Sequence, residues 1–485
     1  SAEAIKKGIA SDGGLFVPEA KVKLGIEEIS KLTSMNYRER AVFILKQYLD
    51  DYSLEELNDC VNSAYTSSKF GSEVITPIVK INENVHILEL WHGPTCAFKD
   101  MALQILPHFL VKAMKKTNEK SEIVILVATS GDTGKAALEG FKDVAGTKII
   151  VFFPDGGVSE VQRMQMVTQE GSNVHSIAVR GNFDDAQTGV KNIFSDKELN
   201  VKMEEKSFKF SSANSINWGR LVPQIVYYFS AYADLIKSGE IIPGDKINFI
   251  VPTGNFGNIL AAYYASEMGL PINRLICASN ENNVLTDFIK TGTYDRNREF
   301  KKTISPSMDI LISSNLERLL FELTGHDSSA VKKWMEELKT RGSYSVDANT
   351  RKSVQKLFWS DFSSEVDTTK TIECIYREYG YVVDTHTAVA IDVYDKYVIS
   401  TGDMTKSVIV STASPFKFNE SVVKAIFGNE TAASMDEFKL LGYLSSKTGL
   451  KIPEGLTGLD KKPILHKVLC EKSAMKDEVG KILGI

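Results

Sequence analysis

The sequence has few cysteines and histidines, and both are scattered along the chain. Five cysteines lie among 485 residues, and no two of them have CxxC spacing. The seven histidines are equally dispersed, and the HExxH pattern of zinc proteases is missing. This pattern argues against a disulfide framework and against a metal site, and it favours reduced thiols in a cytoplasmic protein.

Long apolar runs and clusters of one charge are also missing. No run approaches the roughly 18 apolar residues of a membrane span, and the first seven residues, SAEAIKK, lack the apolar centre of a secretory signal. A trimmed organellar transit peptide stays possible on these grounds. The net charge is −5, from 57 basic and 62 acidic residues, and no Lys/Arg cluster stands out. We therefore expect no membrane and no nucleic acid as partner, while a small anionic substrate remains compatible.

Apolar residues recur at helical spacing near the N-terminus and in continuous runs further on. Residues 1–82 are predicted to form a mainly helical domain, with helices over 37–49 and 54–65. From residue 83 strands and helices alternate, and the run IVILVA at 123–128 is typical of a strand buried on both faces. Such repeated units predict an α/β fold with parallel sheets covered by helices.

The alternation divides the rest of the chain. We expect a large domain formed by residues 83–120 and 215–440, with a helical insertion near 280–365, and a small α/β domain formed by residues 121–214. Residues 441–485 form a C-terminal segment. Ligands of parallel sheets bind where loops leave the carboxyl ends of strands, so the loops after the predicted strands are the place to look for chemistry.

One lysine stands out in the segment WHGPTCAFKD, residues 91–100. Lys99 follows a predicted strand, a Gly-Pro turn and an aromatic residue. An amine placed inside the protein loses hydration, its pKa falls, and it becomes a nucleophile toward carbonyl groups. The alternative is an exposed lysine at a helix start, which is the commoner state of lysine.

The segment PTGNFGN, residues 252–258, lies between a predicted strand and a predicted helix. Its glycines let backbone N–H groups converge on an anion, and the helix N-terminus adds partial positive charge. With Lys99, this phosphate-binding loop points to a pyridoxal phosphate site. The alternative is a plain strand-to-helix turn. The loop residues concerned are Gly254, Asn255, Phe256, Gly257 and Asn258.

Two further loops follow strands. The loop SGDTG, residues 130–134, lacks the Gly and the Ser/Thr that the nucleotide motif GxxxxGK[ST] requires. Its hydroxyl and N–H groups suit a carboxylate, although Thr133 alternatively caps the following helix. In STASP, residues 411–415, a hydroxyl can face a pyridine nitrogen, or the segment is an ordinary turn before Pro415.

Two polar clusters precede predicted helices. The cluster SSANSINWGR, residues 211–220, ends at Arg220 and suits a second phosphate, or it consists of capping residues and a solvated arginine. In the segment DTHT, residues 384–387, His386 is expected to be structural, and Asp384 or Thr385 to be a helix cap.

Taken together, the motifs resemble one family. WHGPTCAFKD, SGDTG, NSINWGR, PTGNFGN, DTHTAVA and STASPFKF occur in this order, with GGLFVP near the N-terminus and SPSMDILISSNLERLL in the insertion. In this combination the chain resembles threonine synthase, in the longer form of fungi and many bacteria, over nearly its whole length. The resemblance implies a fold-type II pyridoxal phosphate enzyme with two parallel-sheet domains and an N-terminal helical cap domain. Such an enzyme converts O-phospho-L-homoserine and water into L-threonine and phosphate.

The resemblance also implies roles for the residues that bind the cofactor. Lys99 would hold pyridoxal 5′-phosphate as an imine, residues 254–258 would bind its phosphate, and Thr412 would face its pyridine nitrogen. Many relatives have an asparagine that contacts the ring hydroxyl at the position of Asp132, so the contact made by Asp132 is an open question. Ser414 stands where many relatives have histidine, and Thr385 where many have proline, but neither change removes a group assigned to chemistry.

For the substrate, the resemblance implies two groups of residues. Ser130, Gly131 and Thr133, together with Asp132, would lie along the substrate carboxylate and the cofactor ring. The candidates for the substrate phosphate are Ser215, Asn217 and Arg220.

Two other functions are compatible with the same motifs. A pyridoxal-phosphate-dependent phospho-lyase would share the early steps and release a 2-keto acid. A non-catalytic pyridoxal-phosphate-binding protein would keep the site without turnover. We expect a monomer or a homodimer in either case.

Overall fold

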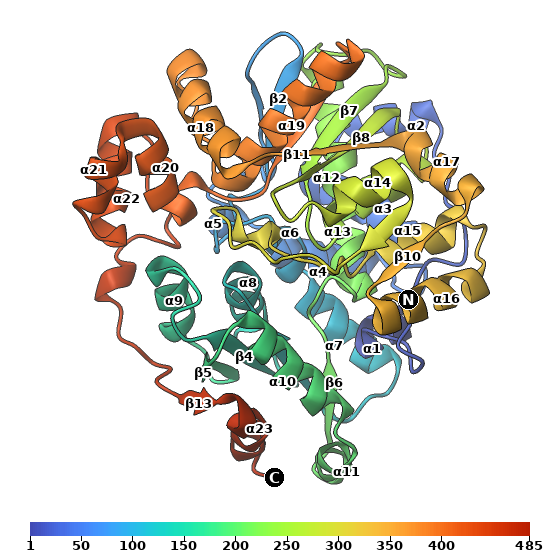
Figure 1. Cartoon of the computed structure of the whole chain (residues 1–485). Coiled ribbons are helices and arrows are strands. Elements are labelled where there is room, and N and C mark those ends of the chain that lie inside the picture. The colour runs from blue at the N-terminus through green and yellow to red at the C-terminus, as the bar shows by residue number, and fades with distance from the viewer.

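The chain has three sheets, one of them formed only by β9 (Thr293–Asp295) and β10 (Ser343–Ser345), and the two larger sheets organise the fold. Figure 1 shows the computed structural model, which describes residues 1–485 apart from the side chain of Asp184. The larger sheet has six strands in the order β1 (Ile78–Lys80), β2 (Val85–Glu89), β12 (Ser407–Ser411), β7 (Ile247–Pro252), β8 (Ile272–Ser279) and β11 (Phe358–Phe362). Its neighbours are parallel except for β1 with β2. The strands β2, β7 and β12 are buried along their whole length, so their sequences contain no alternation of polar and apolar residues.

The smaller sheet lies below the large one in Figure 1 and is parallel throughout. Its order is β13 (Leu469–Glu471), β5 (Val174–Arg180), β4 (Thr147–Pro154), β3 (Glu122–Ala128) and β6 (Phe208–Ser211). Its helices are α8 (Asp132–Phe141), α9 (Glu160–Val167), α10 (Phe183–Ser195) and α11 (Lys197–Glu205). The edge strand β13 comes from the C-terminal segment and was not predicted, because three residues are too few to show a pattern.

The helices of the large sheet include one that is almost fully buried. α12 (Trp218–Lys237) packs against α3 (Tyr37–Lys46), α6 (Asp100–Leu103) and α13 (Gly257–Glu267). A helix that is apolar on all sides belongs in the centre of a large protein. α18 (Glu365–Tyr379) and α19 (Thr385–Thr401) pack against each other, and α19 contacts four strands of the large sheet.

The N-terminal region is helical, as predicted. It consists of α1 (Ala2–Lys7), α2 (Ile26–Lys31), η1 (Leu32–Ser34), α3, α4 (Leu54–Ala64) and α5 (Ser67–Phe70). Capping boxes start α3 at Asn36 with Glu39 and α4 at Ser53 with Glu56. Further on, α6 and α7 (Leu106–Lys116) are separate helices, and Pro107 lies in the first turn of α7.

The insertion is more varied than the helical segment that the sequence suggested. It contains α14 (Val284–Thr291), β9 (Thr293–Asp295), η2 (Pro306–Met308), α15 (Leu316–Leu323), α16 (Ser328–Arg341), β10 (Ser343–Ser345) and α17 (Ala348–Leu357). It then supplies β11, the edge strand of the large sheet, which was not predicted. The loop around η2 is the part of the insertion that reaches the candidate site described below.

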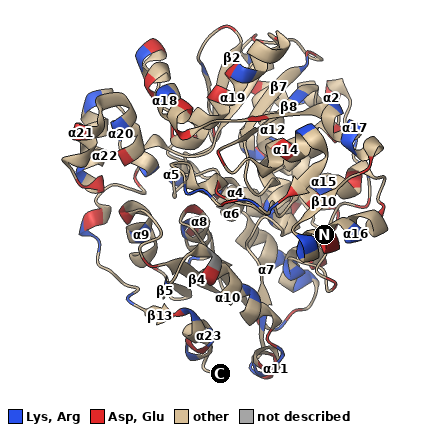
Figure 2. Ribbon diagram, in the orientation of Figure 1, with Lys and Arg blue, Asp and Glu red and all other residues tan. Residues whose placement is uncertain are grey.

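The C-terminal part links the two sheets. After β12 come η3 (Pro415–Phe418), α20 (Asn419–Phe427), α21 (Asn429–Ala433) and α22 (Glu437–Thr448), and the chain then runs through η4 (Leu459–Lys461) to β13, η5 (Lys472–Ala474) and α23 (Met475–Leu483) (Figure 1). Acidic and basic residues are interspersed along the helices around both large sheets (Figure 2). Of the helices in the described residues, none has both the length and the apolar surface to cross a lipid bilayer.

Candidate active site

Loops from both sheets meet around Lys99. The segment after β2 lies against the segment after β12, because Phe98 N–H donates to the carbonyl oxygen of Thr412 at 2.8 Å and Ala97 forms a bridge with Ala413. The loop after β3 brings Asp132 to within 3.5 Å of the Lys99 Nζ atom. All of these loops leave the carboxyl ends of parallel strands, as the sequence predicted.

The amine of Lys99 is buried, with only 11% of its side chain exposed. Burial lowers the pKa of Lys99, nearby Asp132 opposes the shift, and the positive charges of Arg220 and Lys417 add to it. Besides Asp132, the Nζ atom contacts Ser307 Oγ at 3.4 Å. The sequence-based alternative of an exposed lysine is therefore wrong, and this environment favours the neutral, nucleophilic form of the amine more than water does.

The carboxylate of Asp132 has four partners. Its Oδ1 atom lies 2.6 Å from Lys417 Nζ and accepts a hydrogen bond from Gln162 Nε2 at 3.0 Å. Its Oδ2 atom accepts from Ser307 Oγ at 3.2 Å and faces Lys99. Burial alone would raise the pKa of Asp132, but the charges of Lys417 and Lys99 hold it well below the ordinary value.

The loop around η2 is held over this group by His386. Ser307 N–H donates to His386 Nε2 at 3.1 Å, so the ring proton lies on Nδ1 and is donated to Asp384 Oδ2 at 2.8 Å. Asp384 also accepts from the backbone N–H groups of His386 and Thr387, which confirms the predicted cap of α19. The structure thus gives His386 a structural contact, as expected, and that contact positions Ser307.

The loop at residues 254–258 ends in the N-terminus of α13. Phe256 adopts a left-handed conformation with φ of 65°, and α13 begins at Gly257, so the first N–H groups of the helix have no acceptor within it. Asn258 Oδ1 accepts from the hydroxyls of Tyr227 and Tyr228, while its buried Nδ2 has no partner among the described residues. These unpaired donors can bind an anion.

The glycines of this loop permit close approaches. A Cβ atom at Gly254 would lie 3.0 Å from the carbonyl oxygen of Ser307, and one at Gly257 would lie 3.2 Å from Ser215 Cβ. Asn255 is exposed, and its Oδ1 accepts from Ser314 Oγ at 3.3 Å. The insertion therefore lies directly on the loop, which only small residues allow.

The loop at residues 130–134 makes the turn into α8. Gly131, with φ of 136°, is the N-cap, and a Cβ there would lie 2.5 Å from the Gln162 side chain. Thr129 Oγ1 accepts hydrogen bonds from the backbone N–H groups of Gly131 and Gly134 at the start of α8. The prediction that Thr133 caps α8 is therefore wrong. The hydroxyls of Ser130 and Thr133 make no hydrogen bond to another described residue.

The candidate phosphate-binding residues near the start of α12 differ in how many hydrogen bonds their side chains already make within the protein. The Asn217 side chain caps α12 through Gly219 N–H and donates to the carbonyls of Ile5 and Ser212. Ser215 Oγ accepts from Asn315 Nδ2 at 2.9 Å. Arg220 is buried, and among the described residues the only hydrogen-bond partner of its guanidinium is the carbonyl of Ala213, with no carboxylate in reach. Burial lowers the pKa of Arg220 to about 10.

Three residues that no sequence pattern indicated complete the cluster. They are Gln162 at the start of α9, Ser307 in the insertion and Lys417 in η3. The motif STASPFKF contains Lys417, but only Thr412 was singled out from it. Thr412 itself is buried, and its backbone carbonyl accepts a hydrogen bond from the N–H group of Phe98.

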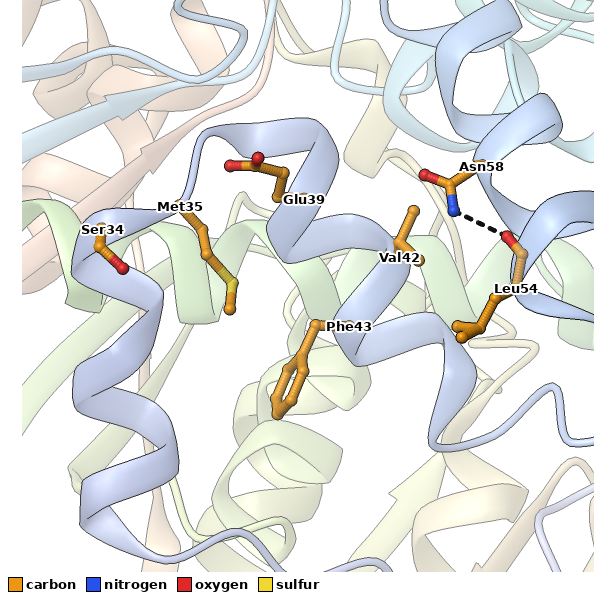
Figure 3. Close-up of a pocket in the computed structure, with 7 residues that line it drawn as sticks. All are labelled: Ser34, Met35, Glu39, Val42, Phe43, Leu54 and Asn58. Atoms are coloured by element: carbon orange, nitrogen blue, oxygen red, sulfur yellow. Dashed lines mark hydrogen bonds between the residues drawn. The ribbon is translucent and has the colours of Figure 1, made fainter.

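Two surface cavities lie away from this cluster. One, of about 470 Å³, is open and lies between η1, α3 and α4; Figure 3 shows its lining, including the hydrogen bond from Asn58 Nδ2 to the Leu54 carbonyl. The other, of about 460 Å³, lies between β2, β12, α18 and α19. No candidate site residue lines either cavity, so chemistry is assigned to the buried cluster and not to these hollows.

The cluster fits pyridoxal phosphate on the groups present. A buried amine with a lowered pKa can bind an aldehyde, and free N–H groups at a helix start together with the unpaired Asn258 Nδ2 can bind a phosphate. The carboxylate of Asp132 and the hydroxyl of Ser307 flank the amine.

Comparison with known proteins identifies the family. Three family models match the chain: Threonine synthase N terminus over residues 1–65, Pyridoxal-phosphate dependent enzyme over residues 71–360, and Threonine synthase, C-terminal over residues 387–469. Threonine synthase from Pseudomonas aeruginosa is 40% identical over 89% of this chain and 88% of its own length. The yeast enzyme, from Saccharomyces cerevisiae, is 38% identical over 92% of this chain and 91% of its own length.

A human relative is longer. Threonine synthase-like 1 of Homo sapiens is 39% identical over 98% of this chain, but the chain spans only 63% of that protein. The same share holds for its counterparts from Macaca fascicularis and Pongo abelii.

Solved structures agree with the family models. The PLP-bound threonine synthase of Brucella melitensis has a TM-score of 0.87 at 34% identity and covers 100% of this chain and 97% of its own. The yeast threonine synthase structure also has a TM-score of 0.87 at 34% identity, covering 100% and 96%. The fold-type II architecture expected from the sequence is confirmed by this agreement. The chain belongs to the threonine synthase family of pyridoxal-phosphate-dependent enzymes.

Proposed function

We propose that this chain is a threonine synthase, which uses pyridoxal 5′-phosphate to convert O-phospho-L-homoserine and water into L-threonine and phosphate. The observation that carries the proposal is the buried Lys99 amine at the junction of loops from both sheets. Membership of the family supplies the substrate and the reaction.

Different residues around Lys99 bind different groups of the cofactor. Lys99 Nζ is the attachment point, and the start of α13 with residues Gly254, Asn255, Phe256, Gly257 and Asn258 binds the phosphate. Thr412 would contact the pyridine nitrogen, and Asp132 would contact the cofactor ring. When bound, the cofactor withdraws electrons from the substrate and stabilises negative charge at its carbon atoms.

Lys99 is also the proton carrier of the proposed reaction. Burial lowers its pKa, which favours the neutral amine that takes a proton from the substrate and returns it at another carbon. Ser307 Oγ at 3.4 Å and Asp132 Oδ2 at 3.5 Å orient the Nζ atom between two acceptors. One amine can therefore serve several proton transfers in one water-excluding site.

The substrate binds through its two anionic groups. The guanidinium of Arg220 is buried without a carboxylate, a costly state that a substrate phosphate would relieve. Ser215 is the second contact proposed for that phosphate. The Asn217 amide already caps α12 and holds Ile5 and Ser212, so we assign it to positioning Arg220. The substrate carboxylate is assigned to Ser130, Gly131 and Thr133 at the start of α8.

The division into domains supports this arrangement. We propose a large domain of residues 83–120 and 215–440 around the six-stranded sheet, and a small domain of residues 121–214, which β13 of the 441–485 segment extends by one strand. Lys99 belongs to the first and Asp132 to the second, so a closing movement of the two would tighten their contact and exclude water.

The test is product analysis with the purified chain. With pyridoxal 5′-phosphate and O-phospho-L-homoserine, we expect L-threonine and phosphate in equal amounts. Release of 2-oxobutyrate and ammonia in place of threonine would identify a phospho-lyase. A visible cofactor band without phosphate release would identify a non-catalytic binding protein. Light scattering of the same sample decides between the proposed monomer and homodimer.

A further inference from the structure

The carboxylate of Asp132 lies between two lysines from different elements. Lys417 Nζ, from η3, is 2.6 Å from Oδ1, whereas Lys99 Nζ is 3.5 Å from Oδ2. The first distance is that of a direct, charge-assisted hydrogen bond, and the second is at the limit of one. The contact of Asp132 with Lys417 is therefore strong, and its contact with Lys99 is weak.

Lys417 is fixed in place. None of its side chain is exposed, its Nζ atom donates to the carbonyl of Thr95 at 3.0 Å, and its backbone N–H donates to the carbonyl of Ser414 at 3.0 Å. Asp132 is its only carboxylate partner within ion-pair distance among the described residues. A buried ion pair of this kind persists because separating it would leave two unpaired charges away from water.

Other charged groups face the pair from the surrounding elements. Arg220 from α12 adds a positive charge near Lys99, and His386 from α19 lies near Asp132, with its own partner Asp384. Asp100 in α6 lies near Lys417, but both of its oxygens accept hydrogen bonds from Thr95. None of these groups replaces Lys417 at Asp132 Oδ1.

We propose that Lys417 is a positioning residue for the reaction proposed above: it neutralises Asp132 and so leaves the Lys99 nitrogen without a committed counter-ion. The inference rests on the proposed function, because it concerns an amine that must be neutral to bind the cofactor aldehyde. It assigns a role to a residue that touches neither the amine nor the loop at 254–258.

The consequence of removing the Lys417 charge follows from the geometry. Asp132 would then have Lys99 as its nearest cation, and the protonated form of the amine would be stabilised. Attachment of pyridoxal 5′-phosphate joins Nζ to the aldehyde carbon and releases one water, and it requires the neutral amine. Attachment would therefore shift to higher pH.

The experiment measures the rate of attachment against pH. The full chain, stripped of cofactor, is mixed with pyridoxal 5′-phosphate, and the visible absorption band is followed for the wild type, K417M, K417Q and K417R. The matched control is K135M, because Lys135 is also a buried lysine, lies in α8 with Asp132 and pairs with Glu139 at 3.0 Å. Circular dichroism monitors the fold of each variant.

We expect the pH midpoint for attachment to rise by about one unit, a tenfold change in proton affinity, in K417M and K417Q. K417R keeps the charge and should stay near the wild type, and K135M should keep the wild-type midpoint whatever it costs in stability. The D132N/K417M double variant removes both charges and should return the midpoint toward the wild type. K417Q provides the test if K417M does not fold.

Wild-type midpoints in K417M and K417Q would overturn the inference, as would an equal shift in K135M. These results are distinct from a failure of the proposed function. A wild type that never develops the band would refute the proposed cofactor site, whereas a wild type that develops the band and makes threonine, with unshifted Lys417 variants, would refute only the role of Lys417.

Discussion

The Oγ atom of Ser307 lies 3.4 Å from the Nζ atom of Lys99, although 208 residues separate the two in the sequence. Ser307 belongs to the insertion, and its backbone is held by His386 from a third segment. The environment of the proposed reactive amine is thus completed by a part of the chain that lies outside the regular alternation of strands and helices.

We expect Lys99→Ala to abolish turnover and the visible band that borohydride reduces, because the only proposed attachment point is removed. Absorption spectra before and after borohydride measure this directly. Lys135→Ala, a control that breaks a buried pair with Glu139, should retain the band. A Lys99→Ala protein that stays yellow and active would refute the assignment of the attachment point.

We expect Arg220→Ala to weaken substrate binding more than cofactor binding. Loss of a buried charge-assisted contact should raise KM for O-phospho-L-homoserine about 10- to 100-fold, while the Kd for pyridoxal 5′-phosphate changes little. Initial rates of phosphate release and a fluorescence titration with the cofactor give the two values. Arg163→Ala, which removes a half-buried arginine paired with Glu160, serves as the control. An unchanged KM would remove Arg220 from the site.

We expect Ser307→Ala to lower kcat about tenfold, the effect of losing one hydrogen bond that orients the amine. The backbone contact with His386 does not involve the hydroxyl, so thermal unfolding should be nearly unchanged. Ser314→Ala, in the same insertion, removes a hydroxyl that contacts only the polar groups of Asn255 and Asn315 and should leave kcat near the wild type. Equal losses in both variants would show that the effect is not specific to the contact with Lys99.

We expect the folding stability of the protein to depend on pH because of Asp100. Burial raises the pKa of Asp100 from 3.8 to about 6, against the two hydrogen bonds from Thr95. Because the folded state holds this proton more tightly than the unfolded state, the contribution to stability is full below pH 4 and is lost as the pH rises to about 6. The loss is about 3 kcal/mol for this shift.

Asp100→Asn cannot titrate, so the free energy of unfolding of the variant relative to the wild type should increase between pH 4 and 6 and then level off. Urea unfolding at several pH values measures this difference. A difference that is constant over the range would contradict the raised pKa.

The sequence was informative wherever a local pattern specified a structure. The apolar run at 123–128 located the strand β3, and the helical spacing near the N-terminus located α3 and α4. The loops after β2 and β12 were expected to meet because neighbouring parallel strands share one carboxyl edge, and the hydrogen bond between Phe98 and Thr412 shows that they do. The contact of Lys99 with Asp132 joins loops from the two different sheets.

The partners of these loops could not be predicted, because nothing local distinguishes them. Ser307 lies in a polar segment, and Lys417 looks like any lysine after a Pro-Phe pair, yet one is in contact with Lys99 and the other is fully buried. The strands β11 and β13 were missed for a related reason, since edge strands of five and three residues are defined by their neighbours and not by periodicity.

The strand β13 has a consequence for how the small sheet is built. Ala178 in β5 donates its N–H to the carbonyl of Val468, while the neighbouring strands β3 to β6 are complete by Ser211. During synthesis, the outer edge of β5 stays unpaired until more than half of the chain has been made after it. An unpaired strand edge at that stage can associate with other nascent chains. We expect the amide of Ala178 to gain hydrogen-exchange protection later in refolding than amides of β3, and simultaneous protection would contradict this order of assembly.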